Sequence, residues 1–289
     1  MPEDRRKGMM PKKVFSQSLY EIRKTGIRKV RLYSTGEPTL HPDFHDFMKQ
    51  LYLNDMEVTV STNGSTLDRC RDALLMASHV QLSISGWDKA SYELLHPPLR
   101  FEETQRKVKE FFRYVAESDG LNQGHKTRVT INLLLTRKTD LRMFLNSWGE
   151  YVDKIRVSFL TGTTRYDGSC FITEQMAGLE EYLYPYRVDA SRGCLYPFDV
   201  VSIAYDGRVV LCCEDFSVML PFGVIDDGVM KCFHSPMMDE VRKGFLSGSL
   251  GVCSGCNRFN RPLLEDVVKI RWVIDGLSNP FKDKLELHV

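Results

Sequence analysis

The 289-residue sequence lacks several features that would assign it to a class at once. No apolar run approaches the ~20 residues that a helix needs to cross a membrane. The charged N-terminus, MPEDRRKG, lacks the apolar segment of a signal peptide. The formal net charge is only +1, so no broad basic surface indicates nucleic acid or an anionic membrane as a partner. We therefore expect a cytoplasmic protein.

Cysteine is also missing from the front of the chain, where none precedes Cys70. Six of the eight cysteines lie between Cys194 and Cys256, and in a long chain without a secretory signal such clustering favours a metal site over disulfides. Cys253 and Cys256 form a Cys-x-x-Cys knuckle. Together with Cys194 and Cys212 they would give four thiolates, which suit either zinc or an iron–sulfur cluster.

The other cysteines are interpreted differently. Cys213 follows Cys212 on a predicted strand, where successive side chains point to opposite faces, so only one of the two is expected to be a ligand. Cys70, Cys170 and Cys232 are interpreted as small buried apolar residues. The alternative for the whole set is scattered free thiols.

Strand-like and helix-like patterns alternate through the first part of the chain. Strands are expected at 27–33, 57–61, 80–85, 128–135 and 155–160, and helices at 14–24, 42–54, 67–77, 102–116 and 141–151. Such alternation predicts an α/β fold with parallel strands and right-handed crossovers.

A second module follows a break in this pattern. Residues 161–186 are interpreted as a linker. Two apolar runs, 200–204 and 208–212, flank an Asp-Gly turn and predict a β-hairpin. Helices are expected at 237–245 and 263–274.

Three of the expected strands end in short polar segments: Ser34-Thr35-Gly36, Ser61-Thr62-Asn63-Gly64 and Ser83-Ile84-Ser85-Gly86. The carboxyl ends of parallel strands share one rim, where α/β proteins bind their ligands. Polar atoms near a core need partners, so three polar ends in a row indicate a shared site.

On these residues the sequence resembles the radical S-adenosylmethionine (radical SAM) superfamily, in particular members with a C-terminal SPASM-type domain. The segment from Thr35 to Pro38 is similar to the family's Gly-Gly-Glu-Pro loop, which holds the amino group of S-adenosylmethionine. Thr35 replaces the first glycine. The resemblance implies that the cofactor-binding residues are Thr35, Gly36, Glu37, Pro38, Ser61, Asn63, Ser83, Ser85 and Asn132.

The resemblance also implies an architecture. A partial (β/α) barrel of parallel strands, with its first strand missing, is expected over residues 1–165. A linker at 166–193, a cysteine-rich SPASM-like module at 194–262 and a C-terminal helix and tail at 263–289 would follow. One auxiliary [4Fe–4S] cluster is implied, on Cys194, Cys212, Cys253 and Cys256. Pro262 stands where a further cysteine would fall in a full SPASM domain.

The sequence departs from the family at its signature, Cys-x3-Cys-x2-Cys, which no three cysteines here match. That motif would lie just upstream of Met1, so a second [4Fe–4S] cluster is expected only if it exists there. Either the sequence is a fragment, which we favour, or the protein has lost the radical chemistry.

The implied activity is cleavage of S-adenosylmethionine to a 5′-deoxyadenosyl radical that modifies an unknown small-molecule or peptide substrate, with an electron-donor protein as partner. One alternative is a degenerate iron–sulfur or zinc binding protein that acts as a partner subunit. Another is a zinc-ribbon protein with a sugar- or nucleotide-binding α/β domain. No general base is assigned, since His41 and His96 are expected to be turn residues.

Overall fold

The computed structural model describes residues 8–33, 36–118, 126–161, 180–189, 194–213, 215, 218, 220–249, 253, 256, 259–277 and 281–289. The chain divides into two compact units. The sheet unit comprises residues 29–160, 181–185 and 262–289, and the cysteine unit comprises residues 1–28, 161–180 and 186–261. Within the described residues, no helix has the length and apolar character needed to span a membrane.

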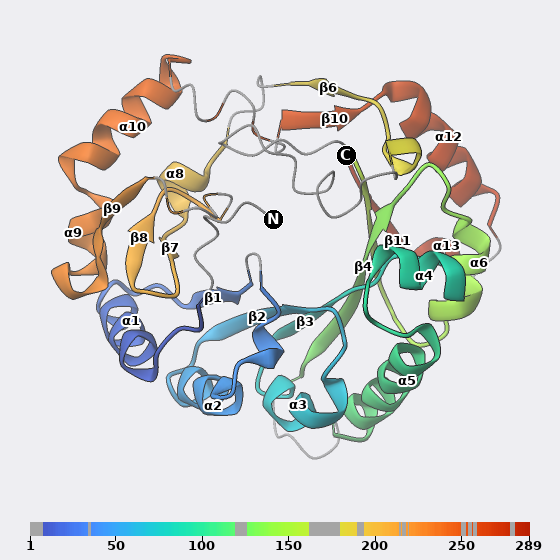
Figure 1. The fold of residues 1–289 in the computed structure, drawn as a ribbon, viewed down its shortest axis with the longest axis horizontal. Helices are drawn as coiled ribbons and strands as arrows, with labels where there is room; N and C mark the ends of the chain where they lie inside the picture. Colours follow the sequence, from blue (N-terminus) through green and yellow to red (C-terminus); the bar gives the residue numbers. More distant parts are fainter. Residues whose placement is uncertain are drawn as a thin grey trace. The chain divides into compact units, whose positions relative to one another are not determined.

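The sheet unit is built on six strands, all paired in parallel. Their order is β1 (Lys29–Leu32), β2 (Glu57–Thr62), β3 (His79–Ser83), β4 (Arg128–Leu135), β5 (Ile155–Phe159) and β11 (Leu285–His288) (Figure 1). The first five are the strands that the apolar pattern predicts. The predicted α/β fold with parallel strands is therefore confirmed.

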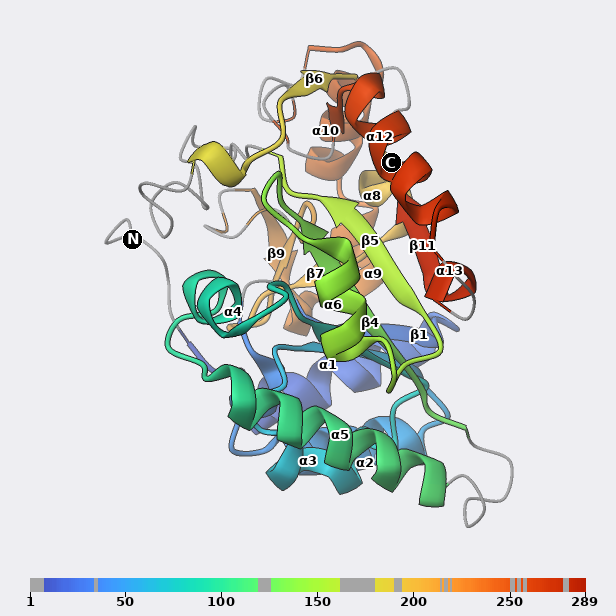
Figure 2. The same ribbon diagram turned by 90° about the vertical axis from the view of Figure 1, so that its right-hand side faces the viewer.

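Helices connect successive strands, as the alternating pattern requires. They are η1 (Pro38–Leu40), α2 (Phe44–Leu53), α3 (Leu67–Leu74), α4 (Lys89–Leu95), α5 (Phe101–Ser118) and α6 (Leu141–Trp148), with η2 (Glu180–Tyr182), α12 (Leu264–Asp275) and α13 (Phe281–Lys284) later in the chain. Helices α2 and α3 pack against each other, and α3 packs against α5 (Figure 2). Of the helices in this unit, α4 was missed by the sequence analysis, because its seven residues show too short a periodic pattern.

The two faces of the sheet differ sharply, because successive side chains of a strand point to opposite sides. One face is apolar, and nine of its strand side chains are at most 1 % exposed: Val58, Val60, Val80, Leu82, Ile131, Leu133, Leu135, Ile155 and Val157. The alternate positions form what we call the polar face, which includes Thr59, Ser61, Gln81, Ser83, Thr130, Asn132, Arg156 and Ser158. The apolar face makes the core with the helices, and the polar face offers hydrogen-bonding groups.

The sixth strand corrects the expectation that the C-terminus is a helix followed by a tail. Helix α12 matches the predicted helix, but residues 285–288 then add β11 to the sheet, with Leu285 opposite Ile155 and Leu287 opposite Val157. Four residues of alternating Leu-Glu-Leu-His are too few to identify a strand by pattern alone. Pairing with β5 supplies the stability that this short segment lacks by itself.

The cysteine unit contains a small antiparallel sheet of β7 (Ser202–Ile203), β8 (Arg208–Val210) and β9 (Pro221–Val224). Strands β7 and β8 are the predicted hairpin, and Gly207 in its Asp-Gly turn has a φ of +87°. The other elements are α1 (Lys12–Lys24), β6 (Tyr186–Val188), α8 (Tyr196–Asp199), η4 (Ile225–Asp227), α9 (Val229–Phe233), α10 (Pro236–Leu246) and β10 (Asn260–Pro262).

Helix α1 packs on η4 and α9, inside the cysteine unit. Residues 262–289, in turn, belong to the sheet unit. The compact units therefore draw on different residues from the predicted domains, whose bounds stay a prediction. Most of the predicted linker, 166–193, lies outside the described residues.

Gly86, three residues after the end of β3, tests how closely the loop after β3 packs on α4. Its φ is +97°, and a Cβ added there would lie 2.5 Å from the Cα of Tyr92. Its carbonyl also accepts a hydrogen bond of 3.1 Å from the indole of Trp148. We expect Gly86→Ala to lower the free energy of unfolding by about 3 kcal/mol, from overpacking and backbone strain combined.

The matched control is Gly26→Ala, because Gly26 has a φ of +79° but no atom within 4 Å of an added Cβ. Only backbone strain remains there, so a loss of about 1 kcal/mol is expected. Urea denaturation followed by circular dichroism measures both variants. Equal losses would contradict the close packing of Gly86 on Tyr92.

Candidate functional site

One carboxylate ties the loop after β1 to the end of β2. Glu37 Oε1 accepts hydrogen bonds from the backbone nitrogen of Thr39 at 3.1 Å and from its hydroxyl at 2.5 Å. Glu37 Oε2 accepts a hydrogen bond of 2.6 Å from the backbone nitrogen of Asn63. Two of the predicted polar strand ends are thereby held together. Gly36 and Pro38 flank the carboxylate, whereas Thr35 lies outside the described residues.

Three buried threonines support this loop, and each is at most 4 % exposed. The hydroxyl of Thr66 donates to Thr39 Oγ1 at 2.5 Å, so the hydroxyl of Thr39 uses its own proton for Glu37. Thr62 Oγ1 lies 3.4 Å from Thr39 Oγ1 and accepts a hydrogen bond of 3.1 Å from the backbone nitrogen of Gly64. The sequence analysis did not select these threonines as site residues, because nothing in their spacing distinguishes them from ordinary core residues.

Three predicted cofactor-binding residues meet on the polar face. The hydroxyl oxygens of Ser61 and Ser83 are 3.1 Å apart on neighbouring strands, and Ser83 lies opposite Asn132 in the β3–β4 pairing. Asn132 Nδ2 donates to Gln81 Oε1 at 3.4 Å, while its Oδ1 is buried without a hydrogen-bond partner among the described residues. A buried acceptor that the protein leaves unpaired is a candidate contact for a ligand that carries a donor.

Ser85 is used differently. It is 7 % exposed, and its hydroxyl oxygen accepts a hydrogen bond of 3.2 Å from the backbone nitrogen of Leu134. Its own backbone nitrogen donates to Nε2 of His96 at 2.8 Å. The hydroxyl of Ser85 thus joins the end of β3 to β4, and its role as a cofactor-binding residue stays a prediction.

The two histidines near the site have structural partners. His41 Nδ1 accepts a hydrogen bond of 3.0 Å from the backbone nitrogen of Asp43, as expected of a turn residue. His96 ends α4 and stacks on Tyr92, with 4.8 Å between the ring centroids. Burial lowers the pKa of His96 to about 4, so the ring that holds Ser85 is neutral at physiological pH.

The four predicted thiolate ligands lie close enough to influence one another. Burial, and after it the neighbouring thiols of Cys256, Cys212 and Cys194, raise the pKa of Cys253 to about 12. The backbone nitrogen of Cys256 donates to the carbonyl of Cys253 at 3.2 Å, which closes the predicted knuckle as a turn.

Even so, among the described residues no three His, Cys, Asp or Glu side chains are already arranged as ligands of one metal ion. The four thiols are therefore neighbours without the closed geometry of a bound metal. By donor type they fit a tetrahedral thiolate site, either zinc or an iron–sulfur cluster. Bound as a thiolate, Cys253 would have to lose the proton that burial favours.

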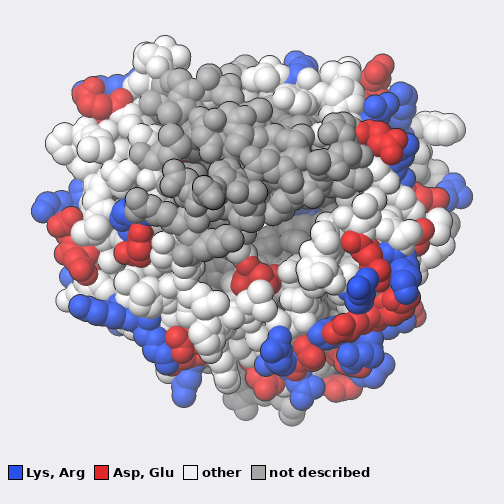
Figure 3. All heavy atoms as spheres, in the orientation of Figure 1, with Lys and Arg blue, Asp and Glu red and all other residues white. Residues whose placement is uncertain are grey.

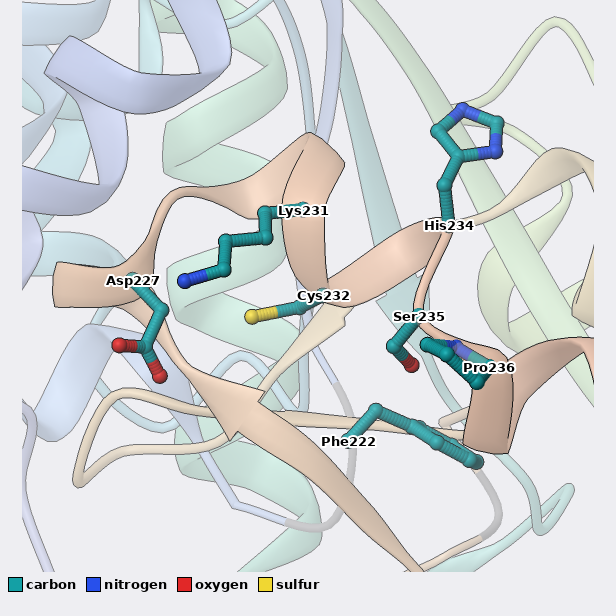
Figure 4. A pocket seen from close by; sticks show the side chains of 7 residues that line it. All are labelled: Phe222, Asp227, Lys231, Cys232, His234, Ser235 and Pro236. Carbon is teal, nitrogen blue, oxygen red and sulfur yellow. The ribbon is translucent and has the colours of Figure 1, made fainter.

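Cys232 lies apart from this set, in the wall of a pocket of about 280 Å³ between β9, α9 and α10 (Figure 4). It is 2 % exposed, and a Cβ added at Gly223 would lie 2.6 Å from its sulfur. Cys232 is thus a buried packing residue, as the sequence analysis expects. Cys70 is half-buried and donates weakly to the carbonyl of Thr39 at 3.5 Å, so it also touches the loop that holds Glu37.

The chain resembles known proteins in part of its sequence and in its fold. Residues 194–257 match the SPASM family model, an iron–sulfur cluster-binding domain. The fold resembles that of Streptococcus suis SuiB, solved bound to S-adenosylmethionine, with 14% identity and a TM-score of 0.58 over 91% of this chain and 67% of SuiB. No curated protein sequence matches the chain.

A second similar structure is BtrN, solved in complex with AdoMet and 2-DOIA. Identity is 13% and the TM-score 0.50, over 88% of this chain and 82% of BtrN. These findings agree with the resemblance drawn from the sequence: the chain shares the fold of SuiB and BtrN and matches the SPASM family model over residues 194–257.

Thr39 gives a test of the support around Glu37. Thr39→Val removes a donor from the Glu37 carboxylate and leaves the buried hydroxyl of Thr66 without its acceptor. We expect a loss of about 2 kcal/mol in the free energy of unfolding, since unsatisfied buried polar groups are costly. Thr39→Ser keeps the hydroxyl and is expected to lose less than about 1 kcal/mol. If urea denaturation gave Ser the same loss as Val, the hydroxyl would contribute no more than the methyl group, which would contradict this account of the loop.

Proposed function

We propose that this chain binds S-adenosylmethionine at the carboxyl ends of β1 to β4 and one [4Fe–4S] cluster on Cys194, Cys212, Cys253 and Cys256, as part of a radical SAM enzyme. The observation that carries the proposal is the joined rim of the sheet unit. There the Glu37 loop, the turn at Asn63 and the unpaired oxygen of Asn132 all belong to the ends or the polar face of adjacent strands.

The residues of this rim suit the polar groups of S-adenosylmethionine. A carboxylate has about four acceptor positions, and Glu37 uses three of them within the chain. The fourth is available to the ligand's ammonium group. Asn132 Oδ1 would accept a hydrogen bond from a ribose hydroxyl, and the hydroxyls of Ser61 and Ser83 would bind the ribose or donate to the carboxylate.

Held by Glu37, Ser61, Ser83 and Asn132, S-adenosylmethionine would supply radical chemistry: with one electron from a reduced cluster it would yield methionine and a 5′-deoxyadenosyl radical able to take a hydrogen atom from the substrate. The contribution of this chain would be to fix the cofactor and to keep water from the reacting atoms. The substrate would be a small molecule or a peptide, and an electron-donor protein would be the partner.

A second candidate is a non-catalytic iron–sulfur or zinc binding protein that serves as a partner subunit. It is favoured by one observation: the 289 residues contain no Cys-x3-Cys-x2-Cys to hold the cluster that reduces S-adenosylmethionine. In these residues the proposal is therefore limited to binding S-adenosylmethionine and one cluster.

Anaerobic reconstitution with iron and sulfide tests the thiolate set. We expect about four iron atoms per chain and broad visible absorbance, as for a [4Fe–4S] cluster. Cys253→Ser should lose most of the iron, because one of four ligands is removed, whereas Cys70→Ser should keep it. Equal iron in the two variants would contradict the ligand assignment. Uptake of zinc without iron would favour the second candidate.

Calorimetry on the same reconstituted protein measures the binding of S-adenosylmethionine. The wild type is expected to bind it saturably. The variant Ser83→Ala/Asn132→Ala should bind it about tenfold more weakly, because it loses two hydrogen bonds to the ligand. The absence of saturable binding to the wild type would refute the enzyme proposal.

A further inference from the structure

The turn that follows β2, residues 63–66, is held by helix α5 as well as by the loop after β1. We call it the β2 turn. Lys107 of α5 donates a hydrogen bond from Nζ to the backbone carbonyl of Ser65 at 2.6 Å. The turn also packs on the same helix, because a Cβ added at Gly64 would lie 3.5 Å from Cγ2 of Thr104, which is 3 % exposed. The β2 turn is therefore fixed from two elements of the sheet unit.

Lys107 is used differently from the other charged residues of α5. Its neighbour Arg106 forms an exposed ion pair with Glu110 at 2.8 Å, and Figure 3 shows acidic and basic side chains intermingled over this helix. Such pairs contribute little to stability. Lys107, by contrast, lies among the buried residues of α5 and is only 9 % exposed. Lysine is rarely buried to this extent without polar partners, and here one partner is the backbone of the candidate site.

The charge of Lys107 is balanced close by. Its Nζ lies 2.8 Å from Glu103 Oε1 and 3.5 Å from Asp68 Oδ1. Hydrogen bonding to Lys107, and then its charge, lower the pKa of Glu103, so this carboxylate is ionised at neutral pH. What Lys107 adds at the β2 turn is therefore a directed donor and not an excess positive charge.

A short series of hydrogen bonds leads from Lys107 to the carboxylate of Glu37. The backbone nitrogen of Ser65, whose carbonyl Lys107 holds, donates to Asn63 Oδ1 at 2.9 Å. The backbone nitrogen of Asn63 donates in turn to Glu37 Oε2 at 2.6 Å. A displacement of Ser65 would therefore move the donor on which Glu37 depends.

We propose that Lys107 is a positioning residue for the S-adenosylmethionine site. By holding the carbonyl of Ser65 it fixes the β2 turn, and through Asn63 it fixes the Glu37 carboxylate before the ligand arrives. A site that is ordered beforehand spends less of its binding free energy on ordering. That the ligand is S-adenosylmethionine rests on the proposed function, whereas the fixing of the turn rests only on the contacts above.

Hydrogen–deuterium exchange without any ligand tests the first step. Lys107→Met keeps the apolar stem of the side chain and removes the donor. The amides of residues 63–66 are expected to exchange about threefold faster than in the wild type, because local opening becomes easier. Exchange in this segment that equals the wild type would overturn the inference.

Thr127→Val is the matched control for lost stability. The hydroxyl of Thr127 is buried and donates to the carbonyls of Leu75 and Ala77, at 2.9 Å each, just before the first residue of β4 and so away from the carboxyl ends of the strands. Its loss also leaves carbonyls without a buried donor. We expect a lower urea midpoint but unchanged exchange in residues 63–66.

Calorimetry with S-adenosylmethionine on the reconstituted protein tests the second step. Lys107→Met should bind it about fivefold more weakly, as for the loss of one hydrogen bond. Lys107→Arg keeps a charged donor and is expected to recover most of the affinity. Thr127→Val should bind like the wild type, and so should Glu103→Gln, which removes an ion pair but leaves the hydrogen bond to Ser65.

Two results would overturn the role of Lys107 while the proposed function stands. One is equal affinity of Lys107→Met and the wild type. The other is an equal loss of affinity in Thr127→Val or Glu103→Gln, since stability or charge would then account for the effect. If the wild type bound no S-adenosylmethionine, the proposed function would fail, and the assignment of Lys107 to that site with it. The exchange measurement would still show whether Lys107 holds the β2 turn.

Discussion

The geometry of the candidate site depends on the Glu37 carboxylate, which accepts hydrogen bonds from both sides of a strand junction. One of its oxygens bonds the loop after β1, and the other bonds the turn after β2. Through these bonds, two polar strand ends form one surface. The buried hydroxyls of Thr39, Thr62 and Thr66 hold the carboxylate in this position. Buried hydrogen-bond networks of this kind are rigid when every member has a partner.

The contrast between the two faces of the sheet explains how such a rim can exist. Apolar residues at every second position pack under the helices and fix the strands in register. The same alternation puts the polar residues together on the other face, where they need partners or ligands. The packing of the apolar face therefore determines which polar side chains lie side by side on the other face, including the row of Arg31, His79 and Arg128.

Sequence reasoning reached the elements that local pattern determines. Five strands and most of the connecting helices follow from apolar spacing, and the Asp-Gly hairpin follows from its turn residues. It missed β11, whose four residues become a strand only through pairing with β5. It assigned α1 to the barrel, because an amphipathic helix has the same spacing whatever it packs against.

The position of the polar strand ends was predictable from the sequence, but the hydrogen-bond partners of their side chains were not. Whether Ser85 bonds Leu134, and whether His96 bonds Ser85, depends on contacts between distant segments.

The central claim is that the rim formed by the Glu37 loop and the β2 turn binds S-adenosylmethionine. Hydrogen–deuterium exchange followed by mass spectrometry, with and without saturating S-adenosylmethionine, tests it most directly. The account predicts slower exchange in peptides that cover residues 36–40 and 61–66, with little change in α5. Unchanged exchange in both rim segments, while other peptides become protected, would place the ligand elsewhere and contradict the account.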